Sequence, residues 1–542
     1  MRTGQKRILD NPAFWLGLAA LLTALLIQSG DLGSIDTVRR LQTTHSFWTS
    51  APAVLPGEYP EFGVMGRNGT IYAWYGMGQS LLMLPSDVVG TYLERMPWFA
   101  GFSDHDPGIR AILVSYTVNI PVCILTVLVC FRFLRLLEFT ANQAVAGALA
   151  LLFGTTFLLY TQNMLENNFI LLLTLTGLCF QYEWVCTGCT RSPTRSLWIG
   201  SLALGANLLT RLTTAMDIAA AALFVVLVLW LEGFRGRDLL ARLYGYARVA
   251  GPSYAVFLLV DRIYQYYRFG SFFNTYVSLA AEQQRKLDPS LPPNFPWTTP
   301  LREGFLGPLI TPEKSIFLFD PLIVLTLLLS FLVWKRFGSE IKAYLLAGLW
   351  LLVIYILFYA RYFVWSGDFA WGDRYITTPV QLLAMISIPL LLRYRAHLRR
   401  VAWRLGVGIA AASLVIQLAS VVFWHPLEIH QMDTRGHPTF VVGLRFENMA
   451  AAVLGKVDQW GLSNDETREI DGIRAQTPYF LPFLLKKDGS ISKMLADGLI
   501  AAWLVGLAAL IAVLLEIGRK ARGEGFATVT LEAEQPAEEF AA

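Results

Sequence analysis

Acidic side chains that could act as bases lie just beyond the ends of apolar segments. Asp36 follows the first apolar run, in the stretch SIDTVRRLQTTHS, and Glu166 lies in TQNMLENN between two further apolar runs. A carboxylate at the boundary between membrane and water can take a proton from a hydroxyl group as a general base. Each also has a structural interpretation, because Asp36 could cap the following helix and Glu166 could interact with a helix dipole. We take Asp36 and Glu166 as candidate catalytic carboxylates, and Asp31 as a weaker candidate.

A second group of candidates is basic and lies at the same ends of the apolar segments. Its members are Arg268, Lys314, Arg361 and Arg374. If the N-terminus is cytoplasmic, these cations lie on the side that the positive-inside rule disfavours. Snorkelling of long side chains does not account for four of them there. Arginine offers a bidentate fork to phosphate and lysine a point charge, so we predict that at least two of the four bind phosphate. Lys314 could instead pair with Asp320, and Arg374 with Asp373.

Aromatic and amide side chains in the first long polar segment could contact a sugar or a lipid head group. Tyr75 and Gln79 lie in GTIYAWYGMGQSLLMLP, where glycines alternate with tyrosine and tryptophan. An aromatic belt at the membrane interface has the same composition, so that alternative stays open. His45, in the stretch that begins with Asp36, is a third candidate for contact with a substrate.

The elements that must position these residues are membrane helices. Of 542 residues, 55% are hydrophobic and 15% are charged, whereas soluble domains have about 25% charged residues. A membrane-spanning helix needs about 20 mostly apolar residues. Twelve segments are candidates, near 12–28, 109–131, 143–160, 167–185, 196–210, 213–231, 249–266, 316–334, 343–360, 374–392, 402–423 and 494–517. We therefore predict an all-α polytopic membrane protein with about 12 transmembrane helices and long outer loops that carry surface helices.

Positive charges alternate along the chain as the positive-inside rule requires. With a cytoplasmic N-terminus, lysine and arginine cluster in every second connection, and the short outer connections hold only Arg211, Arg361 and Arg374. Both termini are then cytoplasmic, and the candidate residues share the outer side. We predict a multi-pass protein of the bacterial inner membrane, with its site facing the periplasm or the outside of the cell.

Three predicted outer segments are long enough to carry structure of their own. They are 29–108, 267–315 and 424–493. We predict a transmembrane module over 1–423, a loop or cap over 424–493 and a last membrane helix over 494–517. The tail, 518–542, is acidic and short of apolar residues, so it is predicted to be disordered on the cytoplasmic side.

Several segments resemble bacterial members of the GT-C superfamily of membrane glycosyltransferases, relatives of the dolichyl-phosphate-mannose-protein mannosyltransferases and lipid A aminoarabinose transferases. The resemblance covers about residues 12–425 and rests on the runs GTIYAWYGMGQSLLMLP, GANLLTRLTTAMD, YRFGSFFNTY, PLITPEKSIFLFDP and WSGDFAWGDRYITTP. It implies a GT-C-like fold for the module over 1–423 and a polyprenyl-phosphate sugar donor. It also implies a catalytic acid on the first outer loop, which Asp36 matches best, and a second acid on the next, which Glu166 fits.

The function that the resemblance implies is transfer of a hexose or pentose from a polyprenyl-phosphate donor to an acceptor on the outer face. The acceptor could be a protein, a lipid or a glycan, and no nucleic acid is expected. Asp36 would deprotonate the acceptor hydroxyl, and Glu166 would orient it. A transporter or flippase of lipid-linked sugars would bind the same phosphate without breaking a bond. A glycan polymerase or ligase would share the donor and use another acceptor.

The pattern of metal-binding residue types assigns no metal site. Asp31 and Asp36 are five residues apart, so the first loop lacks a tandem acidic pair. Cys186 and Cys189 form a single CxxC pair, whereas a structural zinc site needs four ligands. We therefore expect no certain cofactor, with a divalent metal as the open alternative.

Overall fold

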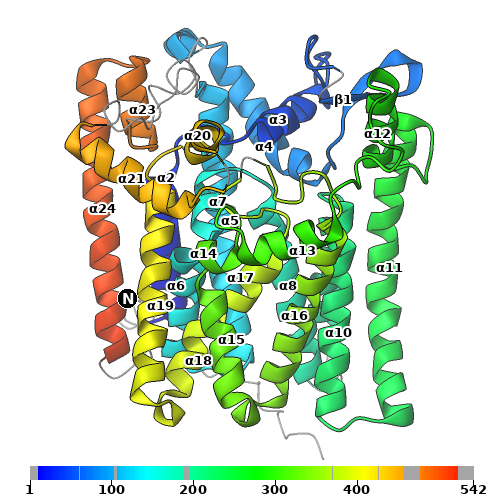
Figure 1. Ribbon diagram of the computed structural model, residues 1–542, viewed down its shortest axis with the longest axis vertical. Helices are drawn as coiled ribbons and strands as arrows, with labels where there is room; N and C mark the ends of the chain where they lie inside the picture. Colours follow the sequence, from blue (N-terminus) through cyan, green and yellow to red (C-terminus); the bar gives the residue numbers. More distant parts are fainter. Residues whose placement is uncertain are drawn as a thin grey trace, which may run out of the picture.

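Helices make up nearly all of the regular structure in the computed structural model of this chain. It describes residues 10–59, 62–102, 107–187, 194–368, 370–424, 426–436, 438–456 and 477–522. Long helices stand side by side, and short helices gather at one end of them (Figure 1). The predicted cytoplasmic tail beyond 522, the first nine residues and Cys189 lie outside the described residues.

Six helices in the described part of the chain are long and apolar enough to cross a membrane, by length and composition. They are α5 (Ile109–Leu136), α8 (Asn167–Cys186), α10 (Ala215–Leu231) with the turn η3 (Leu212–Thr214) before it, α16 (Ser339–Tyr359), α19 (Arg400–Ser420) and α24 (Lys493–Arg522). Shorter apolar helices are α2 (Pro12–Ile27), α6 (Ala141–Gly154) and the pair α17 (Thr377–Met385) and α18 (Ser387–Arg393). These lengths and compositions indicate an integral membrane protein.

The remaining predicted spans are also helical. They hold α7 (Phe157–Gln162), α9 (Thr194–Asn207), α11 (Gly236–Phe269), α14 (Ile316–Phe319) and α15 (Leu322–Val333), with the short turns η4 (Trp334–Arg336) and η5 (Arg395–His397) nearby. A helix or a pair of helices therefore lies in every segment predicted to span the membrane. That all twelve cross the bilayer, and in which direction, stays a prediction.

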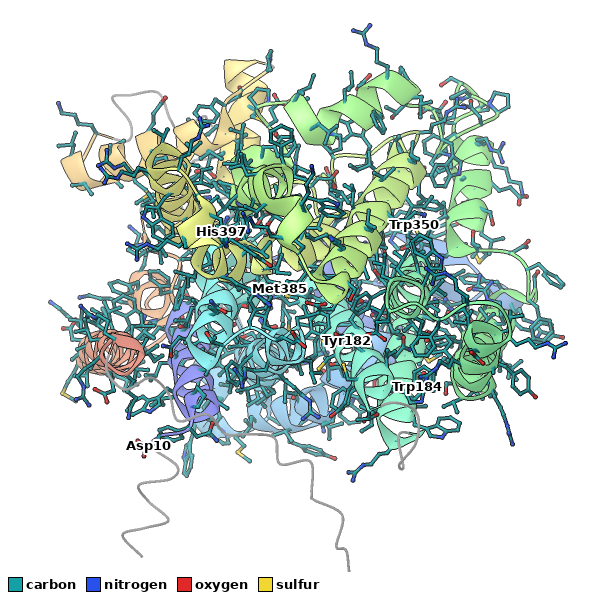
Figure 2. The ribbon with its side chains drawn as sticks, turned by 90° about the horizontal axis from the view of Figure 1, so that it is seen from below. Asp10, Tyr182, Trp184, Trp350, Met385 and His397 are labelled. Carbon is teal, nitrogen blue, oxygen red and sulfur yellow. The ribbon has the colours of Figure 1, made fainter. Side chains whose placement is uncertain are left out.

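Helix α8 is apolar nearly all round, and its burial follows from that composition. It packs against α5, α9 and α10. At its lower end the rings of Phe133, Tyr182, Phe224 and Tyr344 form one cluster, with centroids 5.2–6.3 Å apart. Figure 2, seen from below, shows Tyr182 well inside the ring of helices. The central position of α8 places the residue at its start, Glu166, in the middle of the bundle.

The segments predicted to be outer loops form short elements. They are α3 (Ile35–Ser46), α4 (Gly78–Glu94), η2 (Pro97–Phe102), α12 (Tyr276–Leu287), α13 (Leu301–Ile310), α20 (Leu427–Arg435), α21 (Val441–Leu454) and α23 (Leu481–Asp488). Helices α3, α4, α12, α20, α21 and α23 lie in the upper part of Figure 1, and α13 lies nearer to mid-height. The two helices expected in the first long segment are present as α3 and α4, and that they lie along the membrane surface stays a prediction. Of the predicted cap, 424–493, the stretch 457–476 lies outside the described residues.

The prediction of an all-α protein is wrong in one detail. Strands β1 (Gly63–Met65) and β2 (Ile71–Ala73) form a small antiparallel hairpin around the turn η1 (Arg67–Gly69). Gly69 has a φ of +75°, a left-handed conformation that glycine adopts without steric cost. β-Branched residues on both strands favour pairing. Six paired positions in a Gly-rich loop are too few to show as an alternating pattern in the sequence.

The two ends of the described chain meet at the lower end of the bundle. Lys520 Nζ, in the last turn of α24, lies 3.4 Å from Asp10 Oδ1, just before α2. Helix α2 packs against both α5 and α24. The start and the end of the described chain therefore share one end, and the short helices occupy the other.

Candidate active site

Asp36 lies in the first turn of α3, where the helix dipole favours a negative charge. Ser34 caps this helix, and its Oγ accepts a hydrogen bond of 3.3 Å from the amide of Thr37. Gly33, with a φ of +73°, lies so close to Asn163 that a Cβ would be 2.7 Å from its side chain. A glycine at this position therefore lets the start of α3 approach the segment just before α8.

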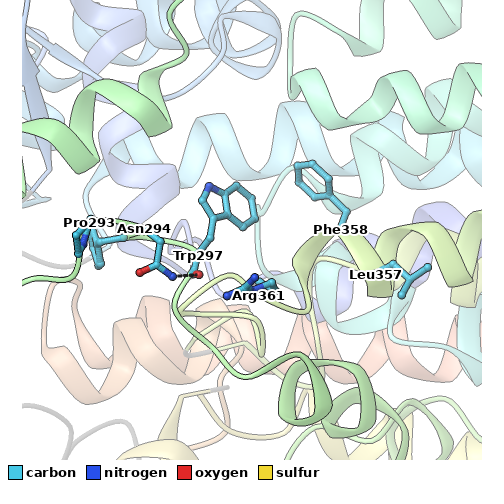
Figure 3. Close-up of a pocket in the computed structure, with 7 residues that line it drawn as sticks. Pro293, Asn294, Trp297, Leu357, Phe358 and Arg361 are labelled. Carbon is cyan, nitrogen blue, oxygen red and sulfur yellow. Dashed lines mark hydrogen bonds between the residues drawn. The ribbon is translucent and has the colours of Figure 1, made fainter.

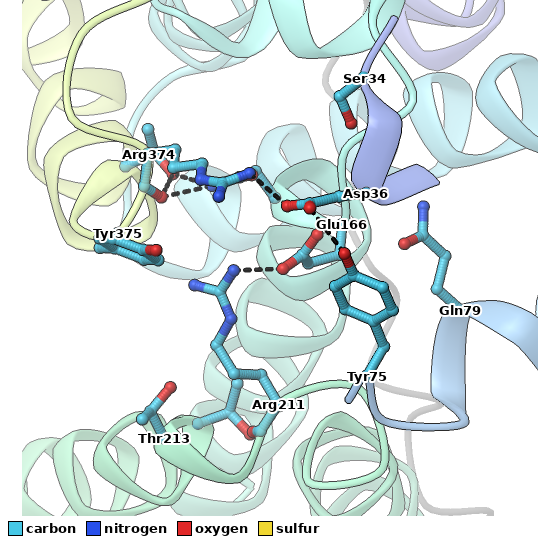
Figure 4. A network of polar contacts seen from close by, with 12 residues as sticks. Ser34, Asp36, Tyr75, Gln79, Glu166, Arg211, Thr213, Arg374 and Tyr375 are labelled. Atoms are coloured by element: carbon cyan, nitrogen blue, oxygen red, sulfur yellow. Dashed lines mark hydrogen bonds and ion pairs between the residues drawn. The ribbon is translucent and has the colours of Figure 1, made fainter. Parts of the chain in front are cut away.

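Asp36 bonds to two residues that are distant in the sequence (Figure 4). Arg374 Nη1 donates to Asp36 Oδ2 at 2.7 Å, and Tyr75 Oη donates to Asp36 Oδ1 at 2.7 Å. The carboxylate keeps 21% of its side chain exposed and Arg374 keeps 14%. Asp36 can therefore be reached by a small group, although it sits in a tight polar network.

Glu166 lies at the start of α8 beside the same cluster and joins two further arginines. Its Oε2 is 2.6 Å from Arg40 Nη1, and its Oε1 accepts a hydrogen bond from Arg211 Nη2. The next residue, Asn167, donates to the carbonyl oxygen of Arg374 and to Thr377 Oγ1, both at 2.6 Å. The start of α8 thus fixes Arg211 by its charge and Arg374 by its backbone.

The arginines decide the ionisation of both carboxyl groups. Burial alone would raise the pKa of Asp36, but Arg374, Arg40 and the hydrogen bond from Tyr75 hold this pKa well below its ordinary value. Burial would likewise raise the pKa of Glu166, yet Arg40 and Arg211 lower it to about 2. Both groups are therefore carboxylates at neutral pH, as a general base must be before it accepts a proton.

The ion pairs of the cluster join more guanidinium groups than carboxylates. Three guanidinium groups, those of Arg40, Arg211 and Arg374, face two carboxylates, those of Asp36 and Glu166. Arg374 Nε is buried and has no hydrogen-bond partner among the residues described. A buried net positive charge is unfavourable unless an anion joins it, and arginine suits phosphate because its fork matches two oxygen atoms. The arrangement is therefore suited to bind a phosphate group beside a carboxylate base.

The loop that carries Tyr75 is held against the loop that carries Arg211. The amide of Gly78 donates to the carbonyl oxygen of Leu209 at 2.8 Å. A Cβ at Gly76 would lie 2.4 Å from that same oxygen, so only glycine permits this approach. Gln79, one residue further, donates from Nε2 to the carbonyl oxygen of Met164 at 2.7 Å, while its Oε1 is buried without a hydrogen-bond partner in the described structure.

Arg268 supports the same loop from the end of α11. Its Nη1 donates to the carbonyl oxygens of Ala73 at 2.8 Å and Tyr75 at 3.1 Å. The side chain is 3% exposed. In this arrangement Arg268 bonds to the backbone that presents Tyr75 to Asp36.

Lys314 likewise bonds to backbone carbonyl oxygens, here in the loop that leads to Arg374. Its ammonium group donates to the carbonyl oxygens of Asp368 at 2.6 Å, Ala370 at 2.7 Å and Gly372 at 3.3 Å. These carbonyls precede Arg374, so Lys314 holds the loop that positions it. Asp320, considered as a partner for Lys314, instead accepts hydrogen bonds from the amide and hydroxyl of Thr156.

Two predicted site residues lie apart from the cluster. His45 is nine residues from Asp36 on α3, which is about 14 Å along the helix axis, and its Nδ1 lies 3.1 Å from Asp87 Oδ2. Arg361 lines a hollow just beyond the C-terminal end of α16. The structure thus brings together Asp36, Glu166, Tyr75, Gln79 and Arg374. Arg268 and Lys314 bond to the backbone of the loops that carry Tyr75 and Arg374.

The donor set does not suit a divalent cation. In the part of the chain that the structure describes, no three histidine, cysteine or acidic side chains lie close enough to hold a metal ion. The two carboxylates of the cluster are matched with three guanidinium groups, which would repel a cation. No step of the chemistry is therefore assigned to a metal.

Two residues of the cluster were not among the candidates predicted from the sequence. Arg40 follows Asp36 by four residues, a spacing that places two side chains on one face of a helix. Arg211 was noted as a cation on the disfavoured side, in the shortest outer connection, without being assigned a role. Both signals were present, but only the fold shows that the two side chains meet at Glu166.

Comparisons with known proteins give a resemblance in fold. No protein-family model and no curated protein matches the chain. Among solved structures it is similar to AglB, an oligosaccharyltransferase from Archaeoglobus fulgidus in complex with an inhibitory peptide and a dolichol-phosphate. The identity is 14% and the TM-score 0.43, over 83% of this chain and 59% of that chain. The chain thus spans about three fifths of the length of AglB.

A second solved structure resembles more of this chain. It is ArnT from Cupriavidus metallidurans bound to undecaprenyl phosphate, with 14% identity and a TM-score of 0.41, over 93% of this chain and 77% of that chain. The likeness to both structures is one of helix arrangement, at low identity.

The segment after α19 contacts the loop of Arg374 through a buried ion pair. Arg445 on α21 bonds to Glu428 on α20 through Nε and Nη2, each at 2.6 Å, and both side chains are fully buried. Its guanidinium also lies 5.0 Å from the ring centroid of Trp371, three residues before Arg374. This pair therefore links α20 and α21 to the loop that leads to the site.

Replacing Arg445 with methionine should lower the free energy of unfolding by about 3–5 kcal/mol, because Glu428 would remain buried without its counter-charge. Unfolding of the purified protein in a denaturing detergent series would measure the change. The double variant Arg445→Met, Glu428→Met should recover most of the loss, since it removes both charges. A double variant as unstable as the single one would contradict this explanation.

The depressed pKa values of Asp36 and Glu166 predict how stability depends on pH. Both groups bind protons less tightly in the folded protein than in the unfolded chain. The unfolded chain therefore takes up more protons as the pH falls below about 4.5, and stability decreases with it. Thermal unfolding should show the full stabilising contribution of these groups, with little dependence on pH, between about pH 5 and pH 8, and a progressive loss of that contribution toward about pH 2. A Glu166→Gln variant that keeps the full acid loss would contradict this assignment.

Proposed function

We propose that the protein transfers a sugar from a polyprenyl-phosphate donor to an acceptor hydroxyl at the cluster of Asp36 and Arg374. The observation that carries this proposal is a partly exposed carboxylate bonded directly to an arginine, in a cluster with one more guanidinium than carboxylate. A base and an anion site side by side suit a reaction that takes a proton from one substrate and releases phosphate from the other. The motifs that resemble GT-C enzymes point to the same donor class.

The proposed reaction is a single displacement. The acceptor oxygen forms a bond to the anomeric carbon while Asp36 takes its proton. The bond between that carbon and the phosphate oxygen breaks, and the electron pair leaves with the phosphate. Arg374 stabilises the charge that develops on the leaving group, because its guanidinium is fixed in place before the reaction begins. The products are the glycosylated acceptor and free polyprenyl phosphate.

Binding of the donor would also activate the base. In the structure Arg374 lowers the pKa of Asp36, so this carboxylate is a weak base. A phosphate that bonds to Arg374 competes with Asp36 for the guanidinium and adds a negative charge nearby. Both effects raise the pKa of Asp36 and make it a stronger base when the donor is present. Glu166 keeps Arg211 and Arg40 in place while the phosphate replaces Asp36 at Arg374.

The side chains around Asp36 suggest where the sugar would lie. Gln79 Oε1 is a buried acceptor without a hydrogen-bond partner in the described structure, beside the Tyr75 ring in Figure 4. A sugar hydroxyl would satisfy it. Arg40 lies 4.3 Å from the centroid of Tyr75, which holds that ring in place. We propose Tyr75 and Gln79 as the contacts of the donor sugar.

Release of polyprenyl phosphate tests the proposal and separates transfer from transport. The purified protein would be reconstituted with a radiolabelled polyprenyl-phosphate sugar and a membrane extract as the source of acceptor. Transfer yields labelled acceptor and free polyprenyl phosphate in equal amounts. A transporter or flippase would move the intact donor between leaflets and release neither product. Movement of intact donor without release would overturn the proposed activity.

A further inference from the structure

Helix α16 has two distinct faces. The residues exposed along it recur every three or four positions, while the intervening positions are buried. The exposed side chains are Leu346, Leu349, Trp350, Val353, Leu357 and Phe358, each between 39% and 45% exposed. This spacing places them on one side of the helix. The stripe is apolar throughout, as a surface in contact with lipid tails must be.

Arg361 continues this stripe beyond the end of α16. It follows Leu357 by four residues and is exposed. Together with Leu357 and Phe358 it lines an open hollow of about 510 Å³, whose opposite wall is the segment from Pro293 to Trp297. Figure 3 shows the rings of Trp297 and Phe358 above the guanidinium group. The hollow therefore combines an apolar approach, aromatic walls and one cation.

The hollow is held in shape by backbone hydrogen bonds. The amide of Thr299 donates to the carbonyl oxygen of Arg361 at 3.1 Å, and the amide of Phe363 donates to that of Pro296 at 2.9 Å. Asn294 Nδ2 donates to the carbonyl oxygen of Trp297 at 2.7 Å. The two walls are therefore joined to each other, and the space between them exists before any ligand arrives.

The cation in this hollow is unpaired. Across the described residues, no acidic side chain lies within 4 Å of the Arg361 guanidinium, and it makes no side-chain hydrogen bond. The three arginines of the catalytic cluster, by contrast, all bond to carboxylates. Snorkelling explains a cation in open water, but it does not explain a preformed hollow with aromatic walls around one. An anionic group at this level would satisfy the charge.

The hollow is separate from the catalytic cluster. Tyr359 lies on the other side of the helix end and is buried. Its ring stacks on Tyr375 with centroids 4.4 Å apart, and Tyr375 in turn lies beside Arg374 and Arg211. The end of α16 thus directs Tyr359 toward the cluster of Asp36 and Arg374, and Arg361 toward the membrane side.

We propose that this hollow binds the phosphate of an anionic glycerophospholipid from the adjacent leaflet, with an acyl chain along the exposed stripe of α16. From Trp350 to Phe358 the stripe is about 12 Å long, close to the half-thickness of the hydrocarbon core, which is about 15 Å. The phosphate then lies at the level of Arg361. Since the lining contains one positive charge and no acidic residue, it favours a head group with a net negative charge.

Native mass spectrometry of the full-length protein in detergent tests this site. Phosphatidylglycerol, phosphatidylcholine and undecaprenyl phosphate would be titrated separately. The wild type should bind phosphatidylglycerol more tightly than phosphatidylcholine. The variant Arg361→Gln should bind phosphatidylglycerol about tenfold more weakly, because one charge-assisted contact is lost. Arg361→Lys should keep part of the affinity, since the charge remains.

A matched control is Arg95→Gln, which removes an exposed cation at the end of α4, far from the hollow along the chain. It should bind phosphatidylglycerol as the wild type does. Equal binding by wild type and Arg361→Gln would overturn the site. A loss of undecaprenyl phosphate affinity in Arg361→Gln, with phosphatidylglycerol unchanged, would overturn it too, because the hollow would then hold the polyprenyl carrier.

Discussion

Replacing Asp36 with asparagine should lower kcat/KM for sugar transfer by about 10²–10⁴-fold, the usual contribution of a general base. Asparagine keeps the size of the side chain and its Oδ1 can still accept a hydrogen bond from Arg374 or Tyr75. Its amide nitrogen cannot accept the other bond, and the group cannot take the acceptor proton. Most of the loss should appear in kcat, because the phosphate contact with Arg374 remains. Initial rates of polyprenyl phosphate release at several donor concentrations would measure both constants.

Asp31 provides the control for this variant. It lies in the same loop, and its carboxylate accepts hydrogen bonds from the amide of Gly33 and the hydroxyl of Tyr479, outside the cluster. Asp31→Asn should therefore retain transfer when the folded protein is assayed. Thermal unfolding of both variants would show whether either is misfolded. Full transfer by a folded Asp36→Asn variant would show that another group accepts the proton.

Replacing Glu166 with glutamine should cause a large loss of stability. Its pKa is lowered from an ordinary value near 4.5 to about 2, which corresponds to about 3 kcal/mol of favourable interaction with the ionised form. The carboxylate is 2% exposed, so solvent screens this interaction little. Without it, Arg40 and Arg211 would remain close together with no counter-charge. Detergent unfolding should show a decrease of about 3–5 kcal/mol in the free energy of unfolding.

Glu282 offers a matched comparison, because it forms an ion pair with Lys286 at 2.7 Å on the exposed face of α12. Exposed pairs contribute little to stability, so Glu282→Gln should leave unfolding unchanged. If Glu166→Gln is as stable as Glu282→Gln, Glu166 does not hold the cluster together. The double variant Glu166→Gln, Arg211→Gln should regain part of the stability, since one of the two unmatched charges is removed.

The positions of the helices could be predicted from the sequence because a membrane segment is recognised by its local composition. An apolar run long enough to cross a bilayer must be helical, since its backbone groups have no water to bond to. Helices accordingly occupy all the predicted segments, including the pair α9 and α10, whose boundary at Arg211 was placed within a few residues. The β-hairpin escaped notice because three-residue strands carry almost no periodic signal.

The chemistry of the site was only partly readable from the sequence. Asp36, Glu166 and Arg374 were chosen for their charge and their positions at helix ends. That Arg374 bonds to Asp36, 338 residues earlier, follows from the fold and from no local pattern. Lys314 looked like a phosphate ligand for the same reason as Arg374, yet its ammonium group bonds to three backbone carbonyl oxygens. A sequence shows that a cation lies near a membrane surface, but not whether carbonyl groups of its own loop already satisfy it.

Binding of undecaprenyl phosphate to wild type, Arg374→Gln and Arg361→Gln tests most directly whether the cluster of Asp36 and Arg374 receives the lipid phosphate. Removal of a charge-assisted contact in a partly buried pocket should weaken binding by about tenfold to a hundredfold in Arg374→Gln. Arg361→Gln should bind the lipid as the wild type does. Unchanged binding by a folded Arg374→Gln variant would contradict the account, because the phosphate would then lie away from the proposed base.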